Sequence, residues 1–410
     1  MAKARKKHRL TTIERKTTLF IIGISSGNLG DDNQMRGIIV AGRQKHETTP
    51  ISRDMLLTAP DGTPLLPHNF ATCEQFEVAV NSSIDTFVKK VKISPAWVIL
   101  PINHQDPQSD NSLVDYLSQT IKTAFAKHNI QVKTLVLASN LYDYKNVDMI
   151  NIVRHRLSVH DENILKQNQL LRPRTIITLG VPSNVNMSAL KHLTNARKTR
   201  QILDNLAPNQ QKIALFALGG ITSNNSIRFT LDDAKKLFDA ASIMVNHNYV
   251  AVFTNSQRTP NDVSDYLFAQ CRSLKNIHFY NSKTIARNDA QKKDFRFYSG
   301  KFTAEFLKQK NDNDDIYPAV LSVCDIYIGT HDSFSYTSEA AALGIKTIVY
   351  TGNEIDTSRQ DCRKLYRLCH KAGYVLSLDE MLKHIEHDED FSTLRMPNIT
   401  TQIINALKKN

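Results

Sequence analysis

The residues best suited to chemistry lie between residues 324 and 344, where a short apolar run gives way to polar side chains. Residues 326–329 have the length and composition of a buried parallel strand. Three polar residues follow it where a helix is expected to begin: Asp332, Ser333 and Ser335. A helix N-terminus carries unpaired N–H groups and a partial positive charge, so a phosphate can bind there, and Glu339 can accept from ribose hydroxyls about one turn further on. The alternative is an N-capped helix with an exposed glutamate.

A second apolar run upstream ends in residues of the same kind. Residues 213–218 lead into Gly219 and Gly220, with Thr222 just beyond them. Because glycines let backbone amides approach a ligand closely, this turn is suited to a phosphate group. We therefore expect two phosphate-binding turns in the same half of the chain.

A third apolar run, residues 250–254, is followed by Ser256, Arg258 and Thr259. This order puts Arg258 at the carboxyl end of a strand, where open α/β sheets bind ligands. Its planar guanidinium group suits a bidentate phosphate contact, and a surface salt bridge is the alternative. Thr259 is a preferred N-cap and Pro260 a preferred first helical residue, so we expect a helix that begins at Pro260.

Five motifs in this order resemble those of the elongated-mitochondria (mitochondrial fission) family, in particular its bacterial members. They are residues 27–37, 172–180, 218–220, 256–260 and 332–340. The fold of that family is similar to that of GT-B glycosyltransferases, with two Rossmann-like domains that face each other across a cleft. Its plant founder acts in organelle division as a recruiting factor. The resemblance therefore implies a fold and leaves two activities open.

The resemblance implies that an amino-terminal glycine-rich loop faces a sugar acceptor. The loop residues it implies are Gly27, Gly30, Asn33 and Gln34. Asp31 stands where the family more often has histidine, and its carboxylate would be the base that takes the acceptor proton. Capping of the following helix is the alternative role of Asp31. Gln257 stands where the family has a second arginine, which weakens the expected anion site.

The resemblance also implies that the carboxy-terminal half binds a nucleotide-sugar, UDP-linked or related. The donor-binding residues it implies are Gly219, Gly220, Thr222, Ser256, Arg258, Thr259, Asp332, Ser333, Ser335 and Glu339. Sugar transfer in this fold generally needs no bound metal, because arginine side chains and helix dipoles stabilise the leaving diphosphate. We therefore expect neither a metal ion nor another cofactor.

Composition and charge restrict the partners. The chain has 410 residues, of which 41% are hydrophobic and 22% charged, as expected for a globular protein with two domains. Its net charge is +12, and the first sixteen residues contain seven basic residues and one acidic residue. Residues 3–16 are either a solvated arm or a segment attracted to an anionic membrane surface. No recognition module indicates specific binding of nucleic acid.

The remaining signals indicate a cytoplasmic protein, with peripheral membrane contact as an option. Five scattered cysteines without a C-x-x-C pair are typical of a reducing compartment. No apolar run is long enough for a membrane span, and no signal peptide is visible. No complete dinucleotide or P-loop fingerprint is present.

Apolar runs alternate with helical patterns along the whole chain, which predicts an α/β protein. The expected strands are residues 19–24, 97–100, 133–138, 175–179, 213–218, 250–254, 277–280, 326–329 and 347–350. We divide the chain into a basic arm (residues 1–16), an acceptor-side domain (17–200) and a nucleotide-sugar domain (201–410), with the last helix returning to the first domain. The predicted function is metal-independent glycosyl transfer; the alternative is a non-catalytic adaptor that recruits a partner protein or a membrane.

Overall fold

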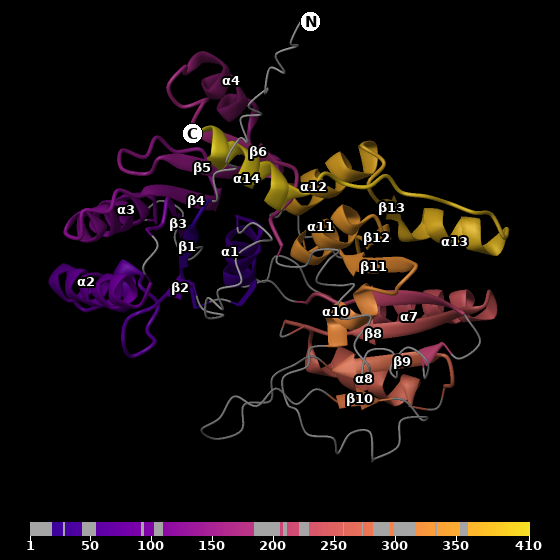
Figure 1. The fold of residues 1–410 in the computed structure, drawn as a ribbon. Helices are drawn as coiled ribbons and strands as arrows, with labels where there is room; N and C mark the ends of the chain where they lie inside the picture. The colour runs from indigo at the N-terminus through magenta and orange to yellow at the C-terminus, as the bar shows by residue number, and fades with distance from the viewer. Residues whose placement is uncertain are drawn as a thin grey trace, which may run out of the picture.

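The structure is a computed structural model with two lobes, each built around one sheet (Figure 1). It describes residues 19–27, 29–42, 55–91, 94–101, 110–183, 206–207, 211–220, 229–256, 258–272, 274–281, 296–298, 316–332, 334–352 and 360–410. The predicted basic arm, residues 1–16, and the predicted domain boundary at residue 200 lie outside these residues. The domain boundary at residue 200 stays a prediction.

The first sheet has six parallel strands in the order β2-β1-β3-β4-β5-β6. They are β1 (Ile21–Ile24), β2 (Leu56–Leu57), β3 (Trp97–Leu100), β4 (Lys133–Ser139), β5 (Met149–Val153) and β6 (Thr175–Thr178). Every residue of β1, β3 and β5 is buried, which is typical of parallel strands covered on both faces.

Helices and short turns connect these strands. They are α1 (Leu29–Gly42), η1 (Pro67–Asn69), α2 (Cys73–Lys90), α3 (Asp110–Ala126), η2 (Arg154–Arg156) and α4 (Val159–Gln167). Side-chain caps mark two of the helix starts: Thr72 accepts a hydrogen bond from the amide of Gln75 before α2, and Ser158 and Asp161 form a capping box at α4.

The second sheet has seven strands in the order β10-β9-β8-β7-β11-β12-β13. They are β7 (Lys212–Ala217), β8 (Tyr249–Thr254), β9 (Ile277–Asn281), β10 (Arg296–Tyr298), β11 (Ile326–Thr330), β12 (Lys346–Tyr350) and β13 (Leu376–Ser377). Only the edge strand β10 is antiparallel to its neighbour.

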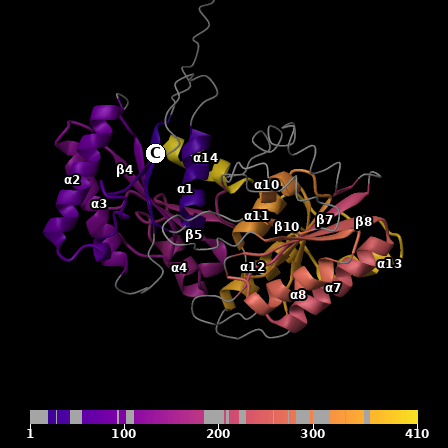
Figure 2. The same ribbon diagram turned by 90° about the horizontal axis from the view of Figure 1, so that it is seen from below.

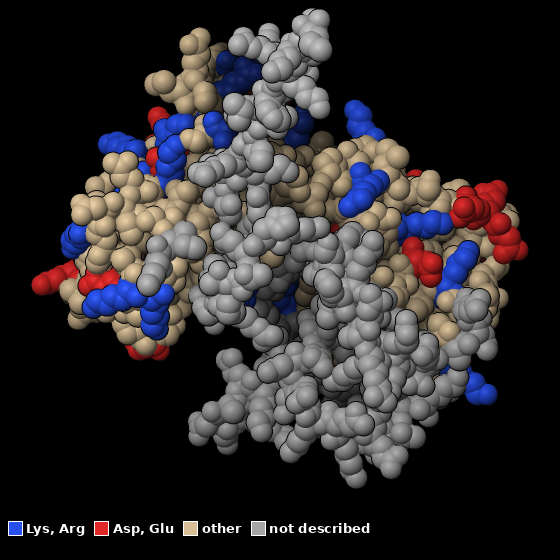
Figure 3. Space-filling model, in the orientation of Figure 1, with Lys and Arg blue, Asp and Glu red and all other residues tan. Residues whose placement is uncertain are grey.

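Helices cover both faces of the second sheet. They are α7 (Leu231–Asn246), α8 (Asn261–Cys271), α10 (Ile316–Leu321), α11 (Phe334–Leu343), α12 (Gln360–Lys371) and α13 (Leu378–Glu386). One apolar core packs under α7, α8 and α13, and another under α10 and α11. Acidic side chains gather at the edge of this lobe near α13 (Figure 3). The predicted α/β class with two Rossmann-like domains is confirmed.

The last helix, α14 (Ile399–Lys409), leaves the second domain and packs on the first. Figure 2 shows it beside α1. Its apolar residues Ile399, Ile403 and Leu407 recur every four residues and are buried in the core of the first domain. Each such side chain contributes about 1.5–3 kcal/mol by leaving water. Between the described elements, the chain therefore passes from the first domain to the second and returns to the first with α14.

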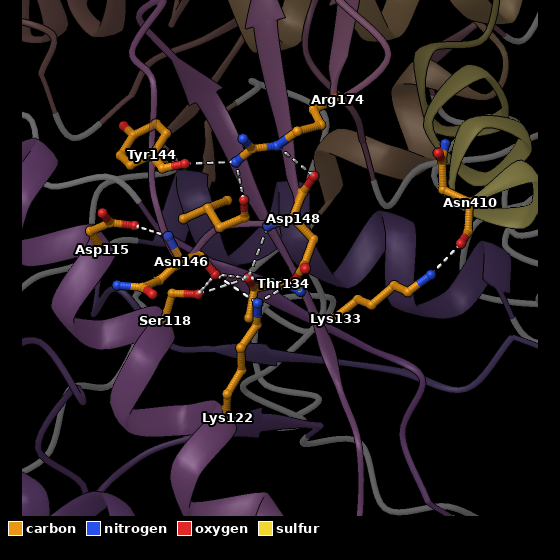
Figure 4. A network of polar contacts seen from close by, with 11 residues as sticks. Asp115, Ser118, Lys122, Lys133, Thr134, Tyr144, Asn146, Asp148, Arg174 and Asn410 are labelled. Atoms are coloured by element: carbon orange, nitrogen blue, oxygen red, sulfur yellow. Dashed lines mark hydrogen bonds and ion pairs between the residues drawn. The ribbon is translucent and has the colours of Figure 1, made fainter. Parts of the chain in front are cut away.

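Some described strands were not predicted: the short edge strands β2, β10 and β13, and the inner strand β5. β5 follows β4 after only nine residues, 140–148, with no helix between the two parallel strands. A network of polar contacts holds this connection (Figure 4). Lys122 donates to the carbonyl of Asn146 and pairs with Asp148 at 2.7 Å, while Asp115 accepts from the amides of Lys145 and Asn146.

Arg174 closes the same network from the start of β6. Its guanidinium group donates to the backbone carbonyls of Tyr144, Val147 and Asp148. Lys133, at the start of β4, donates to the carbonyl of Asn410 and so fixes the end of α14 (Figure 4). This network lies at the amino ends of the strands, opposite the edge where ligands bind in such sheets, so we assign it to folding.

In the described part of the chain, no helix is both long and apolar enough to cross a membrane.

Candidate functional site

The carboxyl ends of β7 and β11 lie side by side at the point where the strand order of the second sheet reverses. β7 lies between β8 and β11, so the chain first builds the sheet to one side of β7 and later to the other. Open α/β sheets bind ligands outside the carboxyl ends of strands at such a switch point. Gly219 and Gly220 follow β7, and Asp332 follows β11. Three of the predicted residues therefore lie at the expected position.

The carboxylate of Asp332 is the centre of this group. It accepts hydrogen bonds from the amide of Gly220 at 3.0 Å and from the hydroxyl of Thr330 at 2.6 Å. Its Oδ2 atom also lies 3.0 Å from Nη2 of Arg258. Only 1% of the Asp332 side chain is exposed, against 42% of the Arg258 side chain. The carboxylate is therefore buried among donors, while much of the guanidinium group faces solvent.

The paired glycines are needed for close approach. A Cβ atom on Gly220 would overlap the backbone carbonyl of Arg258, and one on Gly219 would overlap the carboxylate of Asp332. The amide of Gly219 donates to the hydroxyl of Thr330 at 2.7 Å. Both glycine amides thus have acceptors within the protein, a feature that the sequence did not reveal.

The turn after β8 holds Arg258 against these glycines. The hydroxyl of Thr259 accepts from the amide of Ser256 at 2.9 Å and donates to the carbonyl of Gly219. The hydroxyl of Ser256 lies 3.4 Å from the same carbonyl. Ser256 and Thr259 therefore join the turn to the end of β7, next to Arg258.

The predicted start of the following helix was wrong. Helix α8 begins at Asn261, and Pro260 rather than Thr259 is its N-cap, without a side-chain hydrogen bond. The physical reason is that the Thr259 hydroxyl is already engaged by Ser256 and Gly219 and is not free to cap the helix.

Glu339 lies in the second turn of α11 and is buried, with 7% of its surface exposed. Its Oε2 accepts from the hydroxyl of Tyr317 at 3.0 Å, and its Oε1 accepts from the hydroxyl of Ser183. Burial, with the negative charge of Glu339 as a further cause, holds the pKa of Tyr317 well above its usual value. The expected alternative, a glutamate exposed on a capped helix, is wrong, because this carboxylate is enclosed by hydroxyl groups.

Ser183 follows the last strand of the first sheet, so its contact with Glu339 joins the two domains. The amide of Ser183 donates to the hydroxyl of Thr400 in α14, which donates in turn to the carbonyl of Ser183, both at 3.2 Å. Gly180 lies against Ser338, the residue before Glu339, with no room for a Cβ atom. The segment from Gly180 to Ser183 therefore packs between α11 and α14.

The other predicted donor residues are only partly described. Ser335 is half-buried in the first turn of α11. Thr222, Gln257 and Ser333 lie outside the described residues. Their roles stay predictions.

The predicted acceptor-side loop follows β1. Gly27 has a φ of +72°, which favours glycine, and a Cβ atom there would overlap the ring of Pro64. Gly30 lies within α1, and Gln34 is half-buried on the same helix. The side chains of Asp31 and Asn33 lie outside what the structure describes. No hydrogen bond or ion pair between described residues joins this loop to the group around Asp332.

The carboxylate of Asp32 organises this loop in the described structure. Its carboxylate accepts from the hydroxyl of Ser25 at 2.7 Å and from the amide of Ser26 at 2.8 Å. Asp32 is buried. The sequence carried a signal for this contact, because two serines precede an aspartate in the first turn of the helix.

A small cavity of about 20 Å³, enough for one water molecule, lies beside His331 and between α11 and α12. His331 is buried, and within the described part of the chain its Nε2 atom has no hydrogen-bond partner. Burial lowers the pKa of His331, and the neighbouring carboxylate of Asp332 opposes that shift. No sequence pattern singled out this histidine.

Two Rossmann-like domains joined by a returning C-terminal helix make this a GT-B-like protein. The chain belongs to the mitochondrial fission ELM1 family, whose model matches residues 119–395, more than half of its length. No curated protein matches the sequence.

Several solved structures are similar over nearly the whole chain. UDP-GlcNAc 2-epimerase from Neisseria meningitidis bound to UDP-GlcNAc is 13% identical with a TM-score of 0.46, over 96% of this chain and 99% of that one. The S. aureus MnaA–UDP complex is 13% identical with a TM-score of 0.41, over 95% and 94%. Medicago truncatula UGT71G1 complexed with UDP-glucose is 9% identical with a TM-score of 0.40, over 95% and 93%.

Proposed function

We propose that this protein binds a nucleotide-sugar, UDP-linked or related, at the carboxyl ends of β7 and β11 and transfers the sugar without a metal ion. The observation that carries the proposal is the convergence of Gly220, Arg258 and Asp332 at the switch point of the second sheet. These residues come from three separate segments of the chain, which follow β7, β8 and β11.

The roles of the residues follow from their chemistry. Arg258 has five N–H donors, of which the contact with Asp332 uses few, so its exposed face is available to a diphosphate. Asp332 is then a positioning residue that fixes the guanidinium group. As the bond to the sugar breaks, negative charge grows on the diphosphate, and a fixed cation stabilises it. Glu339 would accept from the ribose hydroxyls.

The base that takes the acceptor proton would be Asp31, in the first turn of α1 after β1. Helix α1 begins at Leu29, so Asp31 is not its N-cap and the capping alternative is wrong. The variant Asp31→Asn tests the role of a base, because the amide has nearly the same size as the carboxylate but does not accept a proton. Transfer should fall by roughly 10²–10⁴ at unchanged donor affinity if Asp31 is the base. Unchanged transfer would remove Asp31 as the base.

A non-catalytic adaptor is the second candidate, and one observation favours it. The two glycine amides and both carboxylate oxygens of Glu339 already have partners within the protein. An adaptor would keep these internal contacts permanently, whereas in a transferase the hydroxyls of the donor would compete with Ser183 and Tyr317 for Glu339.

A panel of nucleotides and nucleotide-sugars in a thermal-shift assay separates the two candidates. A ligand at 100 times its dissociation constant stabilises the folded state by about 2.7 kcal/mol. A shift with at least one nucleoside diphosphate, followed by slow hydrolysis of the matching nucleotide-sugar, supports the transferase. The absence of any shift favours the adaptor.

A further inference from the structure

A groove between α4 and the edge strand β6 has a volume of about 480 Å³. This volume lies within the roughly 300–1,000 Å³ of ligand clefts. The groove shares no lining residue with the group around Asp332. The residues that matter for its chemistry are Arg154, Glu162, Lys166, Arg172, Thr175 and Ile177.

The charge of the groove is predominantly positive. Three basic side chains, Arg154, Lys166 and Arg172, line it against the single carboxylate of Glu162. All three basic residues are exposed, and within the residues that the structure describes their side chains have no ion-pair or hydrogen-bond partner. Unpaired cations in one concave site attract an anionic partner.

The backbone of β6 is available for pairing along this groove. Among the described strands β6 pairs only with β5. The carbonyl of Arg174 accepts from the amide of Ile150, so it faces β5. Because alternate residues of a strand direct their backbone groups to opposite sides, the carbonyls of Thr175 and Ile177 and the amide of Ile177 face the groove.

Apolar side chains accompany the charges. Ile177 on β6 is 46% exposed and lines the groove together with the buried Leu157 and Leu165. Val159 on α4 and Leu170 after it are 77% and 81% exposed, but they are not among the lining residues. A single small anion would use neither the apolar side chains nor the strand edge.

We propose that this groove binds an extended segment of a partner protein with alternating acidic and apolar side chains, which adds as a strand beside β6. Main-chain hydrogen bonds to Thr175 and Ile177 would provide the pairing. Acidic side chains would meet Arg154, Lys166 and Arg172, and the apolar ones would cover Ile177.

A fluorescent octapeptide of alternating glutamate and valine tests the proposal by anisotropy with the full chain. The double variant Arg154→Glu/Arg172→Glu should weaken binding at least tenfold. The matched control Lys89→Glu/Lys90→Glu makes the same change of net charge on two exposed lysines at the end of α2, and it should bind as the wild type does. Equal losses in both double variants would overturn the proposal, because the attraction would then be unspecific.

Strand pairing is tested separately. The same peptide with every amide N-methylated keeps its charge but loses all its amide donors, and it should bind at least tenfold more weakly. The variant Ile177→Pro should have the same effect on the parent peptide, since proline is tolerated where an edge strand turns its N–H outward. Full binding of the N-methylated peptide would contradict the proposal. So would tighter binding to anionic lipid vesicles than to the peptide, if the Arg154→Glu/Arg172→Glu variant abolishes the binding to vesicles.

Discussion

The hydroxyl of Ser183 donates a hydrogen bond to the buried carboxylate of Glu339. Ser183 follows the last strand of the first sheet, and Glu339 belongs to the helix after β11 in the second. If Glu339 binds ribose, the ligand hydroxyls compete with the hydroxyls of Ser183 and Tyr317 for its carboxylate. Donor binding would then be coupled to the contact between the domains.

Ser183→Ala should lower the melting temperature of the free protein and strengthen nucleotide binding by up to about tenfold. The reason is that Glu339 loses a hydrogen bond in the free state, where bonds to charged groups contribute about 1.5–3 kcal/mol. Calorimetric titration and thermal unfolding measure the two effects, with Ser183→Thr as the control that keeps the hydroxyl. Weaker binding by Ser183→Ala would mean that Ser183 positions Glu339 in the complex.

Arg258→Ala should destabilise the protein more than Asp332→Asn does. The first variant leaves a carboxylate that is 1% exposed without its cation, whereas the second leaves a guanidinium group that is 42% exposed. Breaking a buried ion pair costs about 3–5 kcal/mol, which is an upper bound here because Arg258 is partly solvated. Urea unfolding measures the free energy of unfolding of both variants. Equal losses of stability would contradict the buried position of Asp332 and the exposed position of Arg258.

Gly220→Ala should be more harmful than Gly219→Ala. The new Cβ atom on Gly220 meets the backbone of Arg258 and Thr259, which moves only if the whole turn shifts. The Cβ atom on Gly219 meets the side chain of Asp332, which can rotate away. The yield of folded protein and the urea midpoint test this order. If Gly219→Ala proved the more harmful variant, the two glycines would not have the neighbours described here.

The stability of the protein should decrease as the pH falls below about 6.5, the usual pKa of histidine. Burial lowers the pKa of His331 in the folded state, so the unfolded chain binds the proton more tightly. Above the pKa that His331 has in the unfolded chain, the imidazole is neutral in both states and its contribution to the free energy of unfolding is complete. As the pH falls from that value toward the lower pKa of the folded state, this contribution is lost at up to about 1.4 kcal/mol per pH unit. His331→Gln should flatten this part of the profile in urea unfolding at pH 5–8, and an unchanged slope would remove His331 as its source.

Most of the longer strands could be predicted because each is a continuous apolar run bounded by polar or glycine-rich residues. Strand β5 was not predicted, for two physical reasons. No helix separates it from β4, and Asn151 interrupts its apolar pattern. The buried amide of Asn151 donates to the carbonyl of Ile176 and to the hydroxyl of Thr178, so the fold accommodates a polar residue there that the pattern counts against a strand.

The candidate site could be predicted as a set of residues but not as a set of contacts. Strand ends and glycines selected Gly220, Arg258 and Asp332, because local patterns show where strands stop. The pairing of Arg258 with Asp332 depends on which strands are neighbours in the sheet, and the sequence does not give that order. Ser183 and Tyr317 carry no local signal, since a single hydroxyl becomes important only when folding brings it to Glu339.

Titration calorimetry with nucleoside diphosphates tests the central claim, that Glu339 belongs to a nucleotide-sugar site. We predict that UDP or a related diphosphate binds the wild type, and that Glu339→Gln weakens this binding by about 1.5–3 kcal/mol, roughly 10- to 100-fold. The amide has nearly the same size and shape as the carboxylate, so it fills the same space, but one of the two acceptor oxygens becomes a donor, and the free variant should therefore melt somewhat below the wild type. Equal affinity in the two proteins, or no binding by the wild type, would contradict the claim.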